Sequence, residues 1–205
     1  MTSEEKNSKD KKLEITHAAR DFFLDKGYEK TTMVDIIAKL EIPEISVYRY
    51  FKSKDELLEA VIEDFISGYI EKLKVALEKT KGDAFERIRI LRAADRNFVK
   101  EHKEALQKLH SADNVKFHTW QLAVACVKMA SLFAQIIEQG CEEGVFKTDH
   151  PLESAEFLLS GIQFLTDEGV YPWKGEDLSR RAKAIPFVLE ALLKAPKGSL
   201  AFLAK

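Results

Sequence analysis

Cysteine, proline and glycine are all scarce in this chain. Its 205 residues include two cysteines, five prolines and nine glycines. Two isolated thiols, Cys126 and Cys141, exclude a secreted disulfide framework and are typical of a reducing compartment. The shortage of proline and glycine disfavours a fold of strands and tight turns and favours long uninterrupted helices. We therefore expect an all-α protein.

A strong net charge and a long uninterrupted hydrophobic run are also absent. The formal net charge is −2, so nucleic-acid binding has to be argued from where residues lie and not from overall charge. The opening stretch "MTSEEKNSKDKK" lacks the apolar segment of a signal peptide, and we expect residues 1–10 to form a disordered arm. In "WQLAVACVKMASLFAQII", residues 120–137, Lys128 interrupts the apolar run, which favours a buried helix over a membrane span. A cytoplasmic protein with no membrane partner is predicted.

Apolar residues recur at helical spacing in the first third of the chain. The first helix carries them at i, i+3, i+4, i+7 and i+8, namely Ile15, Ala18, Ala19, Phe22 and Phe23. Gly27 provides a left-handed stop, and Thr32 is placed to cap a second, short helix. A third helix is expected over 44–50. The S-x-x-E pattern of Ser53 and Glu56 then predicts a fourth, continuing to about residue 79.

The remaining sequence reads as five more helices joined by short links. We place them near 83–101, 104–112, 115–139, 151–167 and 177–194, with glycines at several ends. Pro186 should kink the last of them. The expected fold is all-α with about nine helices.

The second and third helices predict a helix-turn-helix. Two short helices joined by a brief turn, after a supporting helix, form this motif, and its second helix fits the major groove of DNA. Helix starts present backbone N–H groups to phosphate, which makes Thr31, Thr32, Ser46 and Lys54 chemically suitable backbone contacts. The hydroxyl groups of Tyr48 and Tyr50 are further candidates. Alternatively these rings fill a small core, which is our interpretation for Val47 and Phe51.

Residues 18–65 also resemble the N-terminal domain of the TetR family of bacterial transcription repressors. The matching features are an aromatic pair before "GY", "TT" opening the next helix, an apolar "DIIAKL" and then "VYRYFKSKDELL". The resemblance implies a homodimer with a DNA-binding head, residues 11–55, and a ligand-binding and dimerisation body, residues 56–205. By position, it implies phosphate contacts from Thr31, Thr32, Ser46, Tyr50 and Lys54. It places Glu44, Ile45, Tyr48 and Arg49 on the exposed side of the recognition helix.

The head departs from the family pattern in charge and in its turn. The family usually has glycine where this chain has Glu41, and often Ser-Lys-Gly where it has Pro43, Glu44 and Ile45. Residues 1–55 hold eleven Lys or Arg and eleven Asp or Glu, so fewer phosphate neutralisations are expected. Glu44 could accept a hydrogen bond from a cytosine amino group, and Ile45 could touch a thymine methyl. For these two residues two interpretations stay open: contact with DNA, or exposure to solvent without a functional role.

The body combines aromatic side chains with a few polar groups. Pockets between bundle helices are apolar with a few convergent polar groups, so we expect a small apolar or amphipathic effector beside the helix near 115–139. The candidate effector residues are Phe98, His102, His118, Trp120, Gln121, Met129, Phe133 and Phe164. Aromatic residues at helical spacing are usually plain core, and that interpretation stays open for each of them.

The last two predicted helices are strongly apolar. Pairing with their copies across a two-fold axis would bury this surface as a four-helix interface, and the family resemblance places its dimer contact in the same region. The candidate interface residues are Phe157, Leu158, Ile162, Leu165, Val188, Leu189 and Leu192. Ordinary packing within one chain is the alternative.

Other function classes have less support. No phosphate loop, nucleophile elbow or metal-ligand cluster is visible, so we expect no enzyme, cofactor or metal site. His102, His110 and His118 lack a ligand spacing such as HxxH. Double-stranded operator DNA, a small effector and a second copy are the predicted partners. Two alternatives remain: a degenerate member that binds ligand or protein without DNA, and activation in place of repression.

Overall fold

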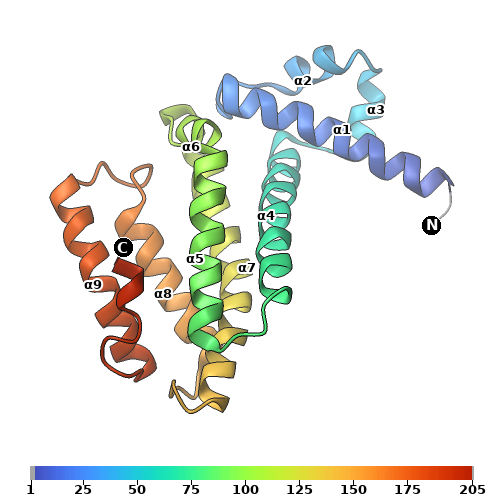
Figure 1. The fold of residues 1–205 in the computed structure, drawn as a ribbon. Coiled ribbons are helices and arrows are strands. Elements are labelled where there is room, and N and C mark those ends of the chain that lie inside the picture. The colour runs from blue at the N-terminus through green and yellow to red at the C-terminus, as the bar shows by residue number, and fades with distance from the viewer. Residues whose placement is uncertain (1–2, 205) are drawn as a thin grey trace. The chain divides into compact units, whose positions relative to one another are not determined.

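The computed structural model describes residues 3–204 and is helical throughout. It contains nine α-helices, two short 3-10 helices and, among the described residues, no strand. The α-helices are α1 Ser3–Asp25, α2 Met33–Leu40, α3 Glu44–Tyr50, α4 Lys54–Glu78, α5 Ala84–Glu101, α6 Lys103–Leu109, α7 Val115–Glu142, α8 Pro151–Thr166 and α9 Gly175–Leu193 (Figure 1). The 3-10 helices are η1 Ala112–Asn114 and η2 Ala201–Ala204. The all-α prediction is confirmed.

One expected disordered segment is helical instead. The predicted arm covered residues 1–10, of which 1–2 lie outside the described residues, and the structure continues α1 back to Ser3. The stretch contains neither proline nor glycine, and its Lys and Glu residues have good helix propensity. Opposite charges also recur one turn apart, as in the ion pair of Lys11 with Glu14 at 2.7 Å.

The chain divides into two compact units, and the division differs from the predicted limit at residue 55. The first unit combines the chain up to Phe65 with Glu104–Gln121, and the second combines Ile66–Lys103 with the chain from Leu122 onward. Both α4 and α7 run across the division. The first unit is therefore built from two separate stretches of sequence.

The core of the first unit is formed by α1, α2, α3, the first half of α4 and the start of α7. Phe23 is fully buried and packs edge-on against Tyr28, with ring centroids 5.1 Å apart, and against Phe117 at 6.1 Å. The other large buried side chains include Ile15, Ile36, Val47, Phe51, Leu57 and Leu58. Burial of such side chains stabilises each by about 1.5–3 kcal/mol. Val47 and Phe51 are core residues, as predicted.

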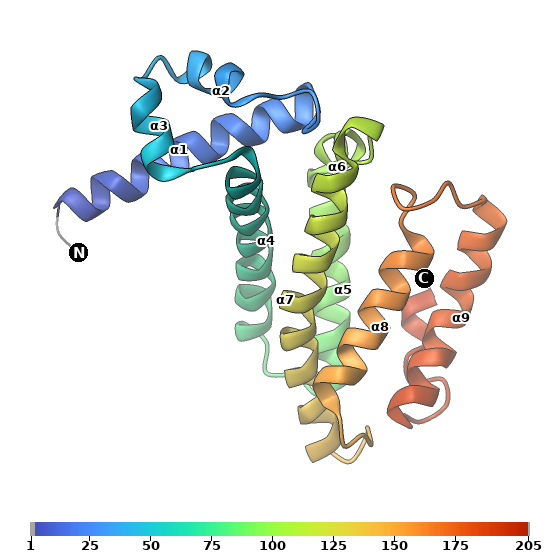
Figure 2. The same ribbon diagram turned by 180° about the vertical axis from the view of Figure 1, so that it is seen from behind.

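The second unit packs the rest of α4 and α7 with α5, α8 and α9 (Figure 2). Its fully buried residues include Leu73, Leu91, Ile136, Leu193 and Leu200. Helix α7 is long and apolar enough by composition to cross a membrane, a test that core helices also pass. It buries Ala130, Leu132 and Ile137 inside the protein, and a third of its apolar window, 33%, is buried.

The C-terminal segment is fastened to α9 by a buried carboxylate. Glu190 accepts hydrogen bonds from the backbone N–H groups of Gly198 and Leu200, each at 2.9 Å. Arg89 of α5 lies over the ring of Phe202 at 3.8 Å. A buried charge is tolerated when its oxygens are hydrogen-bonded, so Glu190 anchors η2 rather than marking a reactive site.

Candidate nucleic-acid interface

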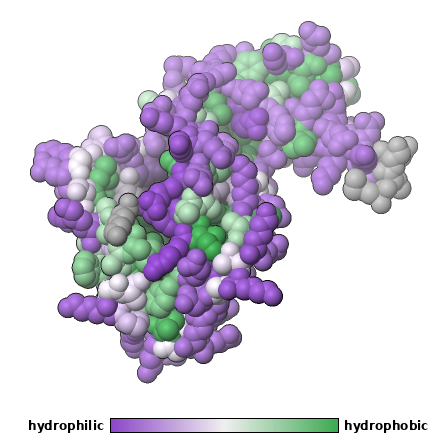
Figure 3. Space-filling view, in the orientation of Figure 1, coloured by the Kyte–Doolittle hydropathy of each residue, from purple (hydrophilic) through white to green (hydrophobic). Residues whose placement is uncertain are grey.

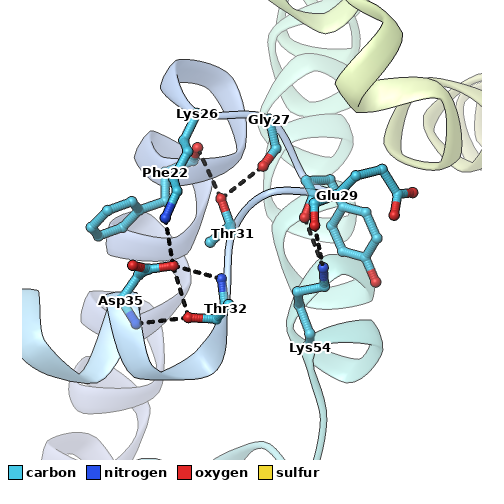
Figure 4. A network of polar contacts seen from close by, with 9 residues as sticks. Phe22, Lys26, Gly27, Glu29, Thr31, Thr32, Asp35 and Lys54 are labelled. Atoms are coloured by element: carbon cyan, nitrogen blue, oxygen red, sulfur yellow. Dashed lines mark hydrogen bonds and ion pairs between the residues drawn. The ribbon is translucent and has the colours of Figure 1, made fainter.

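The first helix of the helix-turn-helix begins with a complete capping box. Thr32 is the N-cap of α2, and its Oγ1 accepts a hydrogen bond from the backbone N–H of Asp35 at 3.2 Å. In return Asp35 accepts from the backbone N–H of Thr32 at 2.8 Å (Figure 4). Two otherwise unpaired N–H groups are satisfied in this way. The predicted start of the second helix is confirmed.

The same carboxylate carries an ion pair from outside the motif. Lys26, just after the end of α1, contacts Asp35 at 2.8 Å. The hydrogen bonds from Lys26 and Thr32 hold the pKa of Asp35 down at about 2. The orientation of α2 against α1 therefore depends on an ionised Asp35.

The turn between α2 and α3 uses a strained residue. Glu41 caps the C-terminus of α2 with φ 52° and ψ 32°, the left-handed conformation that glycine adopts without cost. Pro43 then stands as N-cap of α3. Glu41 thus adopts the left-handed conformation that favours the glycine usually found at this position in the family.

Helix α3 carries six of the residues that the sequence predicts to contact DNA, and several of them lie on its outer side. Ile45 is 81% exposed, and Glu44 and Arg49 are also exposed. Ser46, Tyr48 and Tyr50 are half-buried. Beneath them the fully buried Val47 anchors the helix to the core. Six of the predicted DNA contacts therefore come together on one short helix.

Thr31 lies away from this face, which corrects its predicted role. Its side chain is 1% exposed, and its Oγ1 donates to the carbonyl of Gly27 at 2.7 Å and lies 3.3 Å from that of Phe22 (Figure 4). A hydroxyl buried and bonded in this way is unavailable to phosphate. Thr31 stabilises the turn that leads into α2.

Helix α4 starts at Lys54, shortly after the end of α3. The Oγ of Ser53 accepts from the backbone N–H of Glu56 at 3.1 Å, as predicted, but the Glu56 carboxylate accepts from Lys52 instead of Ser53. Lys54 donates to the carbonyl of Tyr28 at 2.8 Å and lies 4.1 Å from the Tyr28 ring centroid. Its ammonium group is thus held by the turn after α1.

Sequence reasoning missed Tyr28 and Asn114. The backbone N–H of Tyr28 donates to Oδ1 of Asn114 at 2.7 Å, and its hydroxyl donates to Asp55. Burial, together with Asp55, raises the pKa of Tyr28 above its ordinary value. Lys116 contacts Asp55 at 2.8 Å and, with the Tyr28 hydroxyl, lowers the pKa of that carboxyl. No local pattern could reveal these contacts, because Tyr28 and Asn114 are 86 positions apart.

The predicted effector residues are divided between the two units. His118, Trp120 and Gln121 belong to the first, and His118 is buried with its ring 4.8 Å from that of His110. In the second unit, the Phe98 ring stacks on His102 at 4.2 Å and lies 4.3 Å from Tyr69. A cavity of about 180 Å³ opens beside them, lined by Tyr69, Lys72, Leu73, Ala94, Asn97, Phe98 and Glu101.

The other candidates in the second unit differ in exposure. Met129 and Phe133 are half-buried on α7, whereas Phe164 is exposed on α8. Phe164 lies two helical turns after Phe157, so it belongs to the outer side of α8 rather than to an interior pocket.

The predicted dimer residues lie mostly at the surface of α8 and α9. Phe157 is 81% exposed, Val188 58%, and Leu165 and Leu192 are also exposed. Leu158 and Ile162 are half-buried, whereas Leu189 is buried within the protomer and supports this surface from beneath. In Figure 3, hydrophobic and hydrophilic side chains are mixed over the part of the surface where α9 and the C-terminal segment lie in Figure 1.

Comparison with known proteins decides the family. The model for bacterial regulatory proteins of the tetR family matches residues 15–61, and the model for the tetracyclin repressor-like C-terminal domain matches residues 97–187. The first match contains the entire helix-turn-helix described above. The chain belongs to the TetR family. It is a transcriptional regulator with a DNA-binding head, so the resemblance drawn from the sequence is confirmed.

Relatives and solved structures agree with this membership of the TetR family. The uncharacterized HTH-type transcriptional regulator YfiR of Bacillus subtilis is 24% identical over 207 residues, covering 93% of this chain and 96% of YfiR. The HTH-type transcriptional repressor KstR2 of Mycolicibacterium smegmatis is 27% identical, covering 66% and 67%. A TetR-family regulator from Pectobacterium atrosepticum has the same fold, with TM-score 0.62, 18% identity and coverage of 96% of this chain and all of that one.

Proposed function

We propose that this protein is a ligand-responsive repressor that binds a palindromic operator as a homodimer. The observation that carries the proposal is the outer side of α3, where Glu44, Ile45 and Arg49 are exposed above a buried anchor, Val47. An α-helix presented in this way fits the major groove, where base edges are distinguishable. We propose that the protein represses transcription, as the name of the relative KstR2 states for that protein. The proposed function includes no catalysis.

The residues of α3 and of the neighbouring helix starts would make two kinds of DNA contact. Glu44, Ile45, Tyr48 and Arg49 would face base edges or nearby phosphates, while Thr32, Ser46, Tyr50 and Lys54 would contact the backbone. The Ile45 side chain gains nothing from the core, because it is almost fully exposed. An apolar side chain there is suited to a thymine methyl, and the Glu44 carboxylate to a cytosine amino group.

The exposed apolar surface of α8 and α9 supports the dimer. Phe157, Leu165, Val188 and Leu192 contribute it, together with Phe164. Exposed apolar side chains gathered on two helices are typical of an interaction site, and a palindromic operator is matched by a protein with two-fold symmetry. In the dimer, the two α3 helices would lie about 34–36 Å apart, one turn of DNA.

The effector would be a small apolar or amphipathic molecule held among the body helices. The stacked Phe98 and His102 beside Tyr69 supply aromatic surface, and Asn97 and Glu101 supply polar groups at the rim of the cavity. An effector that prefers a body conformation with a different spacing of the two heads must weaken DNA binding, and DNA must weaken effector binding by the same factor. Location in the cytoplasm is part of this proposal.

A second candidate is supported by the charge of the head. Glu41 and Glu44 are both exposed, and acidic and basic residues are equal in number over residues 1–55. Fewer neutralised phosphates weaken DNA binding. The second candidate is therefore a family member that binds ligand or protein without binding DNA.

Selection of duplexes from a random pool at moderate salt separates the two candidates. Recovery of a two-fold symmetric sequence with half-sites about 10–10.5 base pairs apart supports the repressor. The variants Glu44→Ala and Ile45→Ala should then change the recovered bases without changing stability, because both side chains are exposed. Recovery of nothing above background would sink the repressor and favour the second candidate. Transcription in vitro from a template carrying the site distinguishes repression from activation.

A further inference from the structure

The turn between α1 and α2 is held by residues far outside the helix-turn-helix. Oδ1 of the fully buried Asn114 accepts from the backbone N–H of Tyr28 at 2.7 Å, and its Nδ2 donates to the carbonyl of Lys108 at 3.1 Å. The backbone N–H of Glu29 donates to the carbonyl of Asp113 at 3.0 Å. Buried polar groups are costly unless paired, so these bonds fix the turn in one place.

Close packing and ion pairs reinforce this contact. Gly27 has φ +90°, and a Cβ added there would lie 2.4 Å from the Cβ of Asp113, so only glycine fits. Lys30 pairs with Asp113 at 2.5 Å on one side, and Lys108 pairs with Asp25 at 2.6 Å on the other. The segment from Lys108 to Asn114 thus fixes the turn by close packing, by hydrogen bonds and by ion pairs.

Tyr28 connects these contacts to Lys54 and Thr32, two of the residues proposed to contact the DNA backbone. Its carbonyl and ring hold the ammonium group of Lys54, at 2.8 Å and 4.1 Å respectively. Its hydroxyl donates to Asp55, to which Lys116 of α7 is also bonded at 2.8 Å. Thr32, the N-cap of α2, follows four residues after Tyr28 along the same turn. A displacement of Tyr28 would therefore displace both Thr32 and Lys54.

We propose that Tyr28 and Asn114 are positioning residues for DNA binding, and that residues 104–121 are a working part of the DNA-binding head. The proposal rests on the proposed function. The family model for the C-terminal domain includes these residues, whereas the structure groups them with the head. Because α7 continues without a break from Val115 to Glu142, the helix that carries Lys116 also enters the body. Changes in the body then reach Thr32 and Lys54 through Asn114 and Lys116.

A matched pair of tyrosine variants tests the proposal on the duplex recovered by selection. Tyr28→Phe removes the hydroxyl that donates to Asp55 in the head. The control, Tyr171→Phe, removes the hydroxyl of an exposed tyrosine of the body that does not line the effector cavity. We expect Tyr28→Phe to weaken DNA binding by at least about fivefold, the lower end of usual coupling effects. Tyr171→Phe should leave the affinity unchanged. Asn114→Ala should weaken binding at least as much as Tyr28→Phe.

Hydrogen exchange distinguishes the proposed role from a purely structural one, because it measures whether the duplex changes amide exchange over residues 104–121. In the wild type, the duplex should slow amide exchange over residues 104–121 as well as over 26–58. In Asn114→Ala the slowing over 104–121 should disappear while that over 26–58 remains. Equal affinity losses in the two tyrosine variants, or protection confined to residues before 62, would overturn the proposal. Absence of any bound duplex would instead overturn the proposed function on which it rests.

Discussion

At the residue scale, Glu41 shows how a departure from a family pattern has to be interpreted. The sequence shows that glutamate stands where the family usually has glycine, but it leaves open whether the backbone changes to suit the residue. The structure keeps the left-handed conformation, with φ 52°. For an L-residue with a Cβ this conformation costs roughly 1–2 kcal/mol relative to the right-handed one. The turn therefore keeps its shape at the expense of stability.

Replacing Glu41 with glycine should stabilise the protein. Relief of the left-handed strain exceeds the extra entropy that glycine gives to the unfolded chain, and we expect a net gain of about 0.5–1 kcal/mol. Urea unfolding measures it as a higher midpoint with an unchanged slope. Lys39→Gly, inside α2, is the control and should lose about 1 kcal/mol. A loss of stability in Glu41→Gly would show that the turn is not strained.

Thr31 shows where reasoning from residue types reaches its limit. It has the chemistry of a phosphate contact and stands at a predicted helix start. Its hydroxyl is nevertheless buried, and it lies within hydrogen-bonding distance of the carbonyls of Gly27 and Phe22. Whether a hydroxyl or an ammonium group is free for a ligand depends on its neighbours in space, which spacing along the chain does not reveal.

At the scale of elements, the helices were predictable because their determinants are local. The N-cap at Thr32, the stop at Gly27 and the cap at Ser53 lie where the sequence placed them. The helical arm and the attachment of 104–121 to the head were not predicted. The first depended on helix propensity without a core, and the second on contacts between positions 86 residues apart. The α2 capping box and its ion pair allow a test at this scale.

Stability should depend on pH through Asp35. Its pKa falls from 3.8 to about 2 in the folded state, so the unfolded chain binds a proton more readily. The stabilisation is therefore complete above pH 4 and is lost as the pH falls towards 2. Urea unfolding of the wild type and of Asp35→Asn at pH 5, 4, 3 and 2 measures it. The stability difference between the two proteins should shrink towards low pH, and a constant difference would contradict the role of the charge.

At the scale of the whole molecule, the proposed function depends on surfaces that no single protomer completes. The sequence indicated apolar residues on the last two long helices but could not separate inner from outer sides. The structure assigns Leu189 to the inner side and Phe157 and Val188 to the outer side. Because Phe157 makes little use of its own protomer's core, a change there should alter association and spare folding.

Phe157→Glu should therefore separate the dimer into folded monomers. Burial of Phe157 from both protomers contributes about 1.5–3 kcal/mol per side chain, and its loss should raise the dimer dissociation constant by at least about a hundredfold. The introduced carboxylate adds the cost of burying a charge. Sedimentation at several concentrations measures the constant, and thermal unfolding checks the fold. Val127→Glu is a matched control, because Val127 is 63% exposed on α7. Dissociation by Val127→Glu and not by Phe157→Glu would move the interface to α7, and with it the spacing of the two α3 helices on which a palindromic operator depends.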